Sequence, residues 1–153
     1  MIQEFLKTVP LFRDLDDDAL AQVLMVGLVK RFAEGASILT EGTPGGQLHV
    51  IHEGRVRISK VVPGVGEEAL SILGPGEFFG EVEFFDHAAS SAHAIAHTEC
   101  EILTIPHREV EGLMRSHPEI GAQFLWAFGR TLAGRLREMN QKVASIFAIS
   151  KAF

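Results

Sequence analysis

The sequence has a single cysteine, Cys100, among its 153 residues, so it cannot form an internal disulfide bond. Cys100 stands in a run typical of a strand, which predicts a buried structural thiol in a cytoplasmic protein. A reactive thiol is the alternative. Long apolar runs are also missing, because no stretch approaches about 18 uncharged apolar residues, and we predict no membrane-spanning helix. The N-terminus lacks the basic start and long apolar core of a signal peptide.

Basic residues are too few for a typical nucleic-acid-binding protein. Lys and Arg number 14 against 20 Asp and Glu, a net charge of −6. Binding through the phosphate backbone needs basic patches, so we expect no nucleic-acid partner. Common catalytic patterns are missing as well. Ser90 and Ser91 lack a G-x-S-x-G elbow, and the glycines of residues 74–80 lack the long helix and second strand of a dinucleotide-binding unit. We predict that the chain is not an enzyme.

Seven histidines raise the question of a metal site. His49 and His52 are three residues apart in an expected strand, so their side chains should point to opposite faces. His93 and His97 are four apart in a strand-like run and should share a face. Neither an H-x-H nor an H-E-x-x-H pattern occurs. We therefore predict no metal site and no resident cofactor.

Short strands and glycine turns dominate residues 30–106, and this pattern predicts a double-stranded β-roll, or jelly roll. Residues 1–29 should form N-terminal helices, with Pro10 ending the first and Asp16 capping the second. Residues 107–153 should form C-terminal helices. No internal repeat or low-complexity linker divides the chain. We predict one domain over residues 1–153, mainly β with flanking helices.

The last predicted helix is long. Ser116 stands at capping-box spacing before it, Pro118 suits its first turn, and an apolar stripe continues for about seven turns. The first half of this stripe can pack on the chain's own roll, but a small roll is too short to cover the rest. We expect the chain to form a homodimer through this helix. The stripe residues assigned to the dimer contact are Phe128, Leu132, Leu136, Met139 and Val143.

A candidate ligand loop begins with the turn Gly74-Pro75-Gly76 and continues through Gly80 and Glu81 into small residues typical of a strand. Backbone N–H groups at the start of a helical turn attract anions, and a glycine there lets a ligand approach closely. The carboxylate of Glu81 suits sugar hydroxyls. The alternative is a tight turn with phenylalanines packed inside.

Residues 80–92 resemble the phosphate-binding cassette of the cyclic nucleotide-binding domain family, which includes bacterial catabolite activator proteins and regulatory subunits of cyclic-AMP-dependent kinase. Three more stretches carry the resemblance, which covers almost the whole chain. Residues 35–42 resemble the family's early hairpin, residues 48–56 its central strand and glycine turn, and residues 117–119 the start of its C-terminal helix. The resemblance implies a cyclic nucleotide as the ligand.

The cassette departs from the family pattern at positions that bear on the ligand. The resemblance implies that Glu81 takes the ribose 2′-hydroxyl and that an arginine pairs with the cyclic phosphate. Ser90 stands where that arginine is expected, and Glu83 replaces a small residue. A charged hydrogen bond is worth roughly 1.5–3 kcal/mol, so we expect a cyclic nucleotide to bind weakly or a different small ligand to take its place. The candidate pocket residues are Phe79, Gly80, Glu81, Val82, Glu83, Ser90 and Ser91.

Arginines outside the cassette, namely Arg130, Arg135 and Arg137, are expected to reach it only if the last helix folds back. Two functions fit these observations. The first is a stand-alone regulatory module that senses a small ligand. The second is an interaction domain that binds an unidentified protein partner without a ligand, through its surfaces and long helix. Family members that act as transcription factors continue into a helix-turn-helix domain, which this sequence does not encode, so we expect no direct DNA binding.

Overall fold

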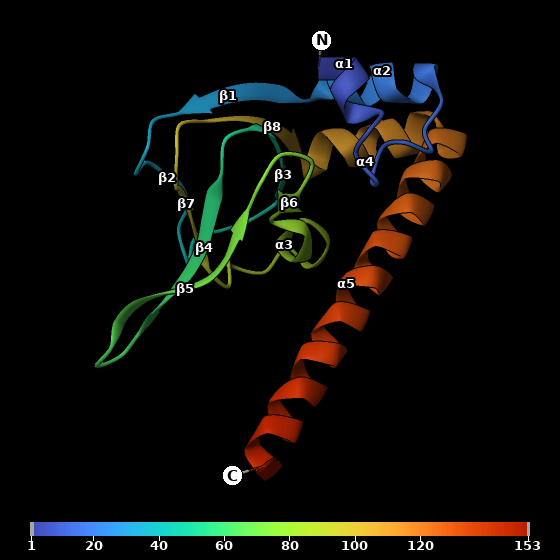
Figure 1. The fold of residues 1–153 in the computed structure, drawn as a ribbon. Coiled ribbons are helices and arrows are strands. Elements are labelled where there is room, and N and C mark those ends of the chain that lie inside the picture. Colours follow the sequence, from blue (N-terminus) through green and yellow to red (C-terminus); the bar gives the residue numbers. More distant parts are fainter. Residues whose placement is uncertain (1, 153) are drawn as a thin grey trace.

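The computed structural model describes residues 2–152 (Figure 1). Helices α1 (Ile2–Leu6) and α2 (Asp17–Val26) come first, α3 (Glu81–Asp86) interrupts the strands, and α4 (His107–Ser116) and α5 (Pro118–Ala152) end the chain. The strands are β1 (Leu28–Phe32), β2 (Ser37–Leu39), β3 (Gln47–Glu53), β4 (Val56–Val62), β5 (Gly66–Leu73), β6 (Phe78–Phe79), β7 (His93–Ala96) and β8 (Cys100–Pro106).

The strands form two antiparallel sheets, in the orders β1-β8-β3-β6 and β2-β7-β4-β5. Between them lies an apolar cluster that includes Ile51, Val56 and Ile102, and it also contains the buried thiol of Cys100. Burial raises the pKa of that thiol, as expected for a structural cysteine. Mainly β structure with flanking helices and a long C-terminal helix is confirmed.

A larger core holds the helices against the first sheet. Apolar residues of α1, α2, α4 and the start of α5 pack there on strands β3 and β8. The predicted cap of α2 is present, because the Asp16 carboxylate accepts a hydrogen bond of 2.8 Å from the backbone N–H of Ala19. The prediction of a capping box at Ser116 is wrong. This residue ends α4, and its hydroxyl donates to the carbonyls of Gly112 and Leu113.

Helix α5 runs for 35 residues without a break. It begins beside α4, and its C-terminal half extends beyond the packed helices (Figure 1). Its buried residues all belong to its first third. Phe128 is one of them: only 1% of its surface is exposed, and its ring packs 4.6 Å from that of Phe85. The assignment of Phe128 to a dimer contact is therefore wrong, since this chain's own core covers it. Leu132 is partly buried, whereas Leu136, Met139 and Val143 are exposed. No helix among residues 2–152 is long and apolar enough to cross a membrane.

His49 on β3 is buried in the roll, with 4% of its surface exposed. Its Nδ1 lies 3.1 Å from the Thr104 hydroxyl, and its ring stacks on Phe79. Burial, helped by the charge of Lys30, lowers the pKa of His49 from 6.5 to about 4. The unfolded chain therefore binds a proton at this histidine in a pH range where the folded chain does not.

This difference predicts a loss of stability in mild acid. His49 contributes its full stabilising effect above about pH 6.5, and the effect is lost as the pH falls toward about 4. Between about pH 7.5 and about pH 5, we expect the free energy of unfolding to drop by about 2 kcal/mol from this residue. Urea unfolding at both pH values measures the drop. It should shrink in His49→Gln but persist in the control His97→Gln, because His97 is exposed. An equal drop in both variants contradicts the prediction.

Candidate ligand cavity

The cassette begins at a tight connection between β6 and α3. Gly80 has a φ of 80°, and a Cβ atom there would lie 2.6 Å from the carbonyl oxygen of Gln47. Only glycine fits this position without a backbone shift. The preceding turn is closed twice, because the backbone N–H of Glu77 donates to the carbonyl of Gly74 and the Gly74 N–H donates to the Glu77 carboxylate. The sequence therefore fixes where α3 begins.

A cavity of about 550 Å³ lies between the cassette, the second sheet and α5. This volume is in the range of small-molecule sites. Its polar wall comes from the cassette, and its apolar wall includes Leu39, Ile58, Leu136 and Met139. Six of the predicted pocket residues line it, namely Phe79, Gly80, Glu81, Val82, Glu83 and Ser91.

Ser90 differs from this set. Only 3% of its surface is exposed, it does not line the cavity, and its hydroxyl has no hydrogen-bond partner in the structure. Its backbone is instead tied to the loop after β2, because its N–H donates to the carbonyl of Thr43 and its carbonyl accepts from Gly42. The prediction that Ser90 lines the pocket is wrong, and Ser91 takes that place.

Arg135 of α5 closes one side of the cavity. Its guanidinium donates 2.7 Å hydrogen bonds to the Glu81 carboxylate and to the Phe78 carbonyl, and it lies 3.8 Å from the centre of the Phe78 ring. The expectation that a helix arginine needs a folded-back helix is wrong, because α5 is continuous and Arg135 still reaches the cassette. Arg135 stands seven residues, or two turns, after the buried Phe128, so helical spacing alone could have placed it on the roll side.

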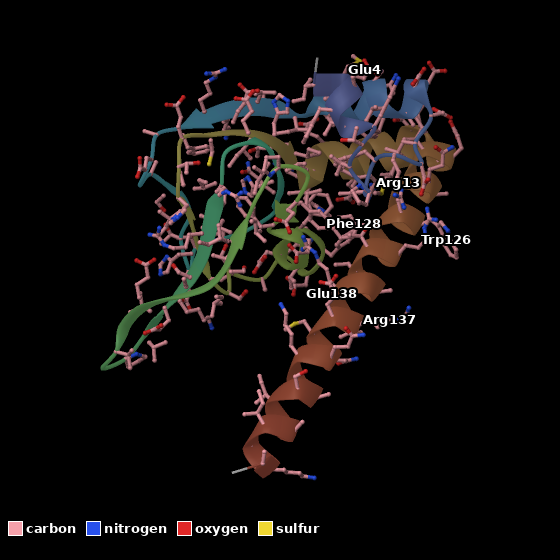
Figure 2. All side chains as sticks on the ribbon, viewed as in Figure 1. Glu4, Arg13, Trp126, Phe128, Arg137 and Glu138 are labelled. Atoms are coloured by element: carbon pink, nitrogen blue, oxygen red, sulfur yellow. The ribbon has the colours of Figure 1, made fainter. Side chains whose placement is uncertain are left out.

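The two neighbouring arginines do not join this site. Arg130 pairs with Asp14. Arg137 points away from the roll, on the side of α5 opposite to Glu138 (Figure 2). Trp126 also points away, whereas Phe128 points inward (Figure 2). Among residues 2–152, the cavity's only lysine or arginine side chains are therefore those of Arg135 and Lys142, both from α5.

Glu83 occupies the centre of the altered cassette. It is 6% exposed, and one of its carboxylate oxygens accepts hydrogen bonds of 3.0 and 3.2 Å from the backbone N–H and the hydroxyl of Ser91. No ion pair within residues 2–152 involves Glu83. The cassette thus presents a buried carboxylate where the family pattern has a small residue.

The histidines on β3 lie as predicted, with His49 inside the roll and His52 outside. His52 lies 2.7 Å from the Glu101 carboxylate, and this hydrogen bond is the main reason that the pKa of Glu101 is lowered. Together, His52, Glu101 and Glu53 place three potential metal-ligand atoms within 4.8 Å of one another. Glu101 also pairs with Arg31 at 2.8 Å, so a cation already neutralises its carboxylate.

Comparison with known proteins agrees with this geometry. A model of the cyclic nucleotide-binding domain family matches residues 29–117, which is more than half of the chain. The chain belongs to the cyclic nucleotide-binding domain family. The resemblance stated from the sequence is therefore confirmed. Within the family, the chain is 30% identical over 145 residues to a CRP-like cAMP-activated global transcriptional regulator of Mycobacterium tuberculosis, which covers 95% of this chain and 63% of that protein. The chain spans about three fifths of the length of that regulator and of the cyclic AMP receptor protein of Thermus thermophilus.

Two solved structures have the same fold as this chain. The N-terminal domain of a transcriptional regulator from Streptomyces coelicolor A3(2) is 32% identical, with a TM-score of 0.77 over 91% of this chain and 94% of that one. The regulatory subunit of a cAMP-independent protein kinase A from Trypanosoma brucei shares the fold at 24% identity, with a TM-score of 0.71 over 84% of this chain and 44% of that one. That structure is a variant bound to cAMP, with glutamate changed to alanine, threonine to arginine seven positions later, and valine to alanine at the next position.

Proposed function

We propose that this chain is a regulatory module that senses a small ligand in the cavity between its cassette and α5. The contact of Arg135 with Glu81 and Phe78 carries the proposal. A ligand that reaches the Glu81 carboxylate also meets the guanidinium of Arg135, so its binding must change the anchoring of the helix that leaves the roll. Binding and helix position are then thermodynamically linked.

We further propose that cyclic nucleotides bind weakly here. The cavity has Arg135 and Lys142 but also the carboxylates of Glu77, Glu81, Glu83 and Glu138. At an effective dielectric constant of about 20, two like charges about 4 Å apart repel by roughly 4 kcal/mol. The trypanosome variant supports this interpretation, because Glu83, Ser90 and Ser91 have the same spacing as its three substituted residues and the first of the three is a glutamate in both proteins. The parent of that variant is the regulatory subunit of a cAMP-independent protein kinase A.

We also propose that the chain forms a homodimer through α5. Leu132, Leu136, Met139, Val143 and Ile146 follow one another at alternating steps of four and three residues. This is the heptad spacing of a helix that pairs with another helix. All of them except Leu132 are among the exposed large apolar residues of the structure. We refer to these five residues as the α5 seam.

A titration with cyclic AMP tests the ligand proposal. We expect no measurable rise in melting temperature at about 10 μM, because stabilisation follows RT ln(1 + [L]/Kd) and vanishes when the ligand is far below Kd. At about 5 mM, amide NMR signals of Gly80 and Ser91 should shift. Arg135→Gln should weaken these shifts, whereas the control Arg137→Gln should not, because Arg137 points away from the roll. A clear melting shift at about 10 μM contradicts weak binding. The absence of any shift at about 5 mM favours the ligand-independent interaction domain.

A further inference from the structure

Glu83 is fixed in the cassette by packing against a neighbouring loop. Its Cβ packs beneath the loop that follows β2, and a Cβ atom added at Gly45 would lie only 2.4 Å from it. An isolated bridge between Pro44 and Ala89 joins the same loop to the cassette. The side chain is 94% buried in consequence, yet it lines the cavity. Glu83 therefore stays beside any ligand that enters the cassette.

The hydrogen bonds at Glu83 define what it can accept. Ser91 gives both of its donors, the N–H and the O–H, to the same carboxylate oxygen, Oε1. The other oxygen, Oε2, has no hydrogen-bond donor among residues 2–152. A carboxylate accepts hydrogen bonds and donates none, and the Ser91 hydroxyl, once it donates, still accepts. This end of the cavity offers acceptors and negative charge.

A cyclic phosphate and a free nucleoside present opposite chemistry to such acceptors. The cyclic phosphodiester is an anion whose phosphate carries acceptors only. The nucleoside has neutral 3′- and 5′-hydroxyl groups in the corresponding place, and each of them donates a hydrogen bond. Buried polar groups that remain unpaired discriminate strongly against the wrong ligand, so this difference suffices for selection.

We propose, building on the proposed function of this cavity, that its preferred ligand is a nucleoside without a phosphate and that Glu83 discriminates between the two. The ribose of such a ligand meets Glu81 at one end and Glu83 with Ser91 at the other. Its base lies toward the apolar wall that Leu136 and Met139 provide. The same site thus reports on the dephosphorylated form of a nucleotide.

Isothermal titration with adenosine, guanosine, cyclic AMP and cyclic GMP tests the inference on the unmodified chain. We expect at least one nucleoside to bind at least about tenfold more tightly than its cyclic counterpart, which corresponds to about 1.4 kcal/mol. Glu83→Gln removes the charge but keeps the shape, and it should lower that ratio by about tenfold. Glu109→Gln makes the same charge change at an exposed position of α4 and should leave the ratio unchanged.

Four results separate this inference from the function on which it rests. Equal or tighter binding of the cyclic nucleotides to the unmodified chain overturns it, and so does an unchanged ratio in a folded Glu83→Gln. If no nucleoside binds, but the combination Glu83→Ala, Ser90→Arg and Ser91→Ala binds cyclic AMP, the cavity is a ligand site and only the nucleoside preference is wrong. If neither chain binds any of the four compounds, the ligand-sensing function is wrong as well.

Discussion

A chain that carries Glu83→Ala together with Ser90→Arg should bind cyclic AMP roughly 30- to 1000-fold more tightly than the unmodified chain. Ser90 is buried outside the cavity, so the arginine must displace the loop before β7 to enter it. Once there, it supplies a bidentate, charged donor for the phosphate oxygens, and the alanine removes a buried carboxylate that repels them. Together these changes are worth roughly 2–4 kcal/mol, at about 1.4 kcal/mol per factor of ten. Titration calorimetry with cyclic AMP on the parent, the two single variants and the double variant gives the four affinities.

The two changes should not act independently. In Ser90→Arg alone, the new guanidinium has Glu83 as a nearby partner and pairs with it instead of the phosphate. The double variant should therefore gain more than the sum of the singles. Because Ser90 is buried and Ser91 faces the cavity, Glu83→Ala with Ser91→Arg is the matched control for position. Glu81→Ala in the better-binding double variant should then reduce affinity, because it removes the acceptor for the ribose hydroxyl.

A folded double variant that binds no better than its parent contradicts this account. If the variant built on Ser91→Arg gains the affinity instead, the phosphate end lies at residue 91 and the loop before β7 keeps its present path. If neither arginine variant gains affinity, removal of the Glu83 carboxylate does not make this cavity a site for a cyclic nucleotide.

Most of the fold could be predicted because its signals are local. Glycine turns, β-branched runs and the Asp16 cap each act within a few residues, and they placed the β-roll at residues 30–106, against an observed span from Leu28 to Pro106. The cassette was recognised for the same reason, since its residues are contiguous. Its departures at Glu83 and Ser90 were visible in the sequence as well.

Features that depend on the path of a loop or the rotation of a helix could not be predicted. The loop after α3 turns at His87, which has a φ of 60° and is the only residue other than glycine with a positive φ among residues 2–152. Further along the same loop, Ser91 lines the cavity and Ser90 is buried. The apolar stripe of α5 likewise showed no boundary between Phe128, which the roll covers, and Leu136, which it does not.

Arg135 marks that boundary on α5. The buried residues of α5 all lie before it, and the large apolar residues after it are exposed. Its partner Glu81 and the Phe78 ring hold the helix at the edge of the cavity. The proposed seam begins next to this contact, at Leu132 and Leu136. A ligand that competes for Glu81 would therefore act on the same turns of α5 that start the dimer contact.

Replacing Leu136 and Val143 together by glutamate should convert the proposed dimer into a monomer. These side chains are 63% and 48% exposed in the single chain, so their replacement should hardly change the stability of the roll. In a paired helix they occupy the seam, where the glutamates of both copies would be desolvated and would repel one another. We expect the dimer dissociation constant to rise by roughly a thousandfold or more, which corresponds to about 4 kcal/mol.

Sedimentation equilibrium of the intact chain and of the double variant, at protein concentrations of about 1 to 100 μM, distinguishes a dimeric parent from a monomeric variant. The control Gln141→Glu adds one negative charge on a part of α5 away from the seam and should leave the dimer intact. Truncation after Gly134 removes most of the seam and should also give a monomer. A monomeric parent, or a double variant that still forms a dimer, shows that α5 does not pair through these residues.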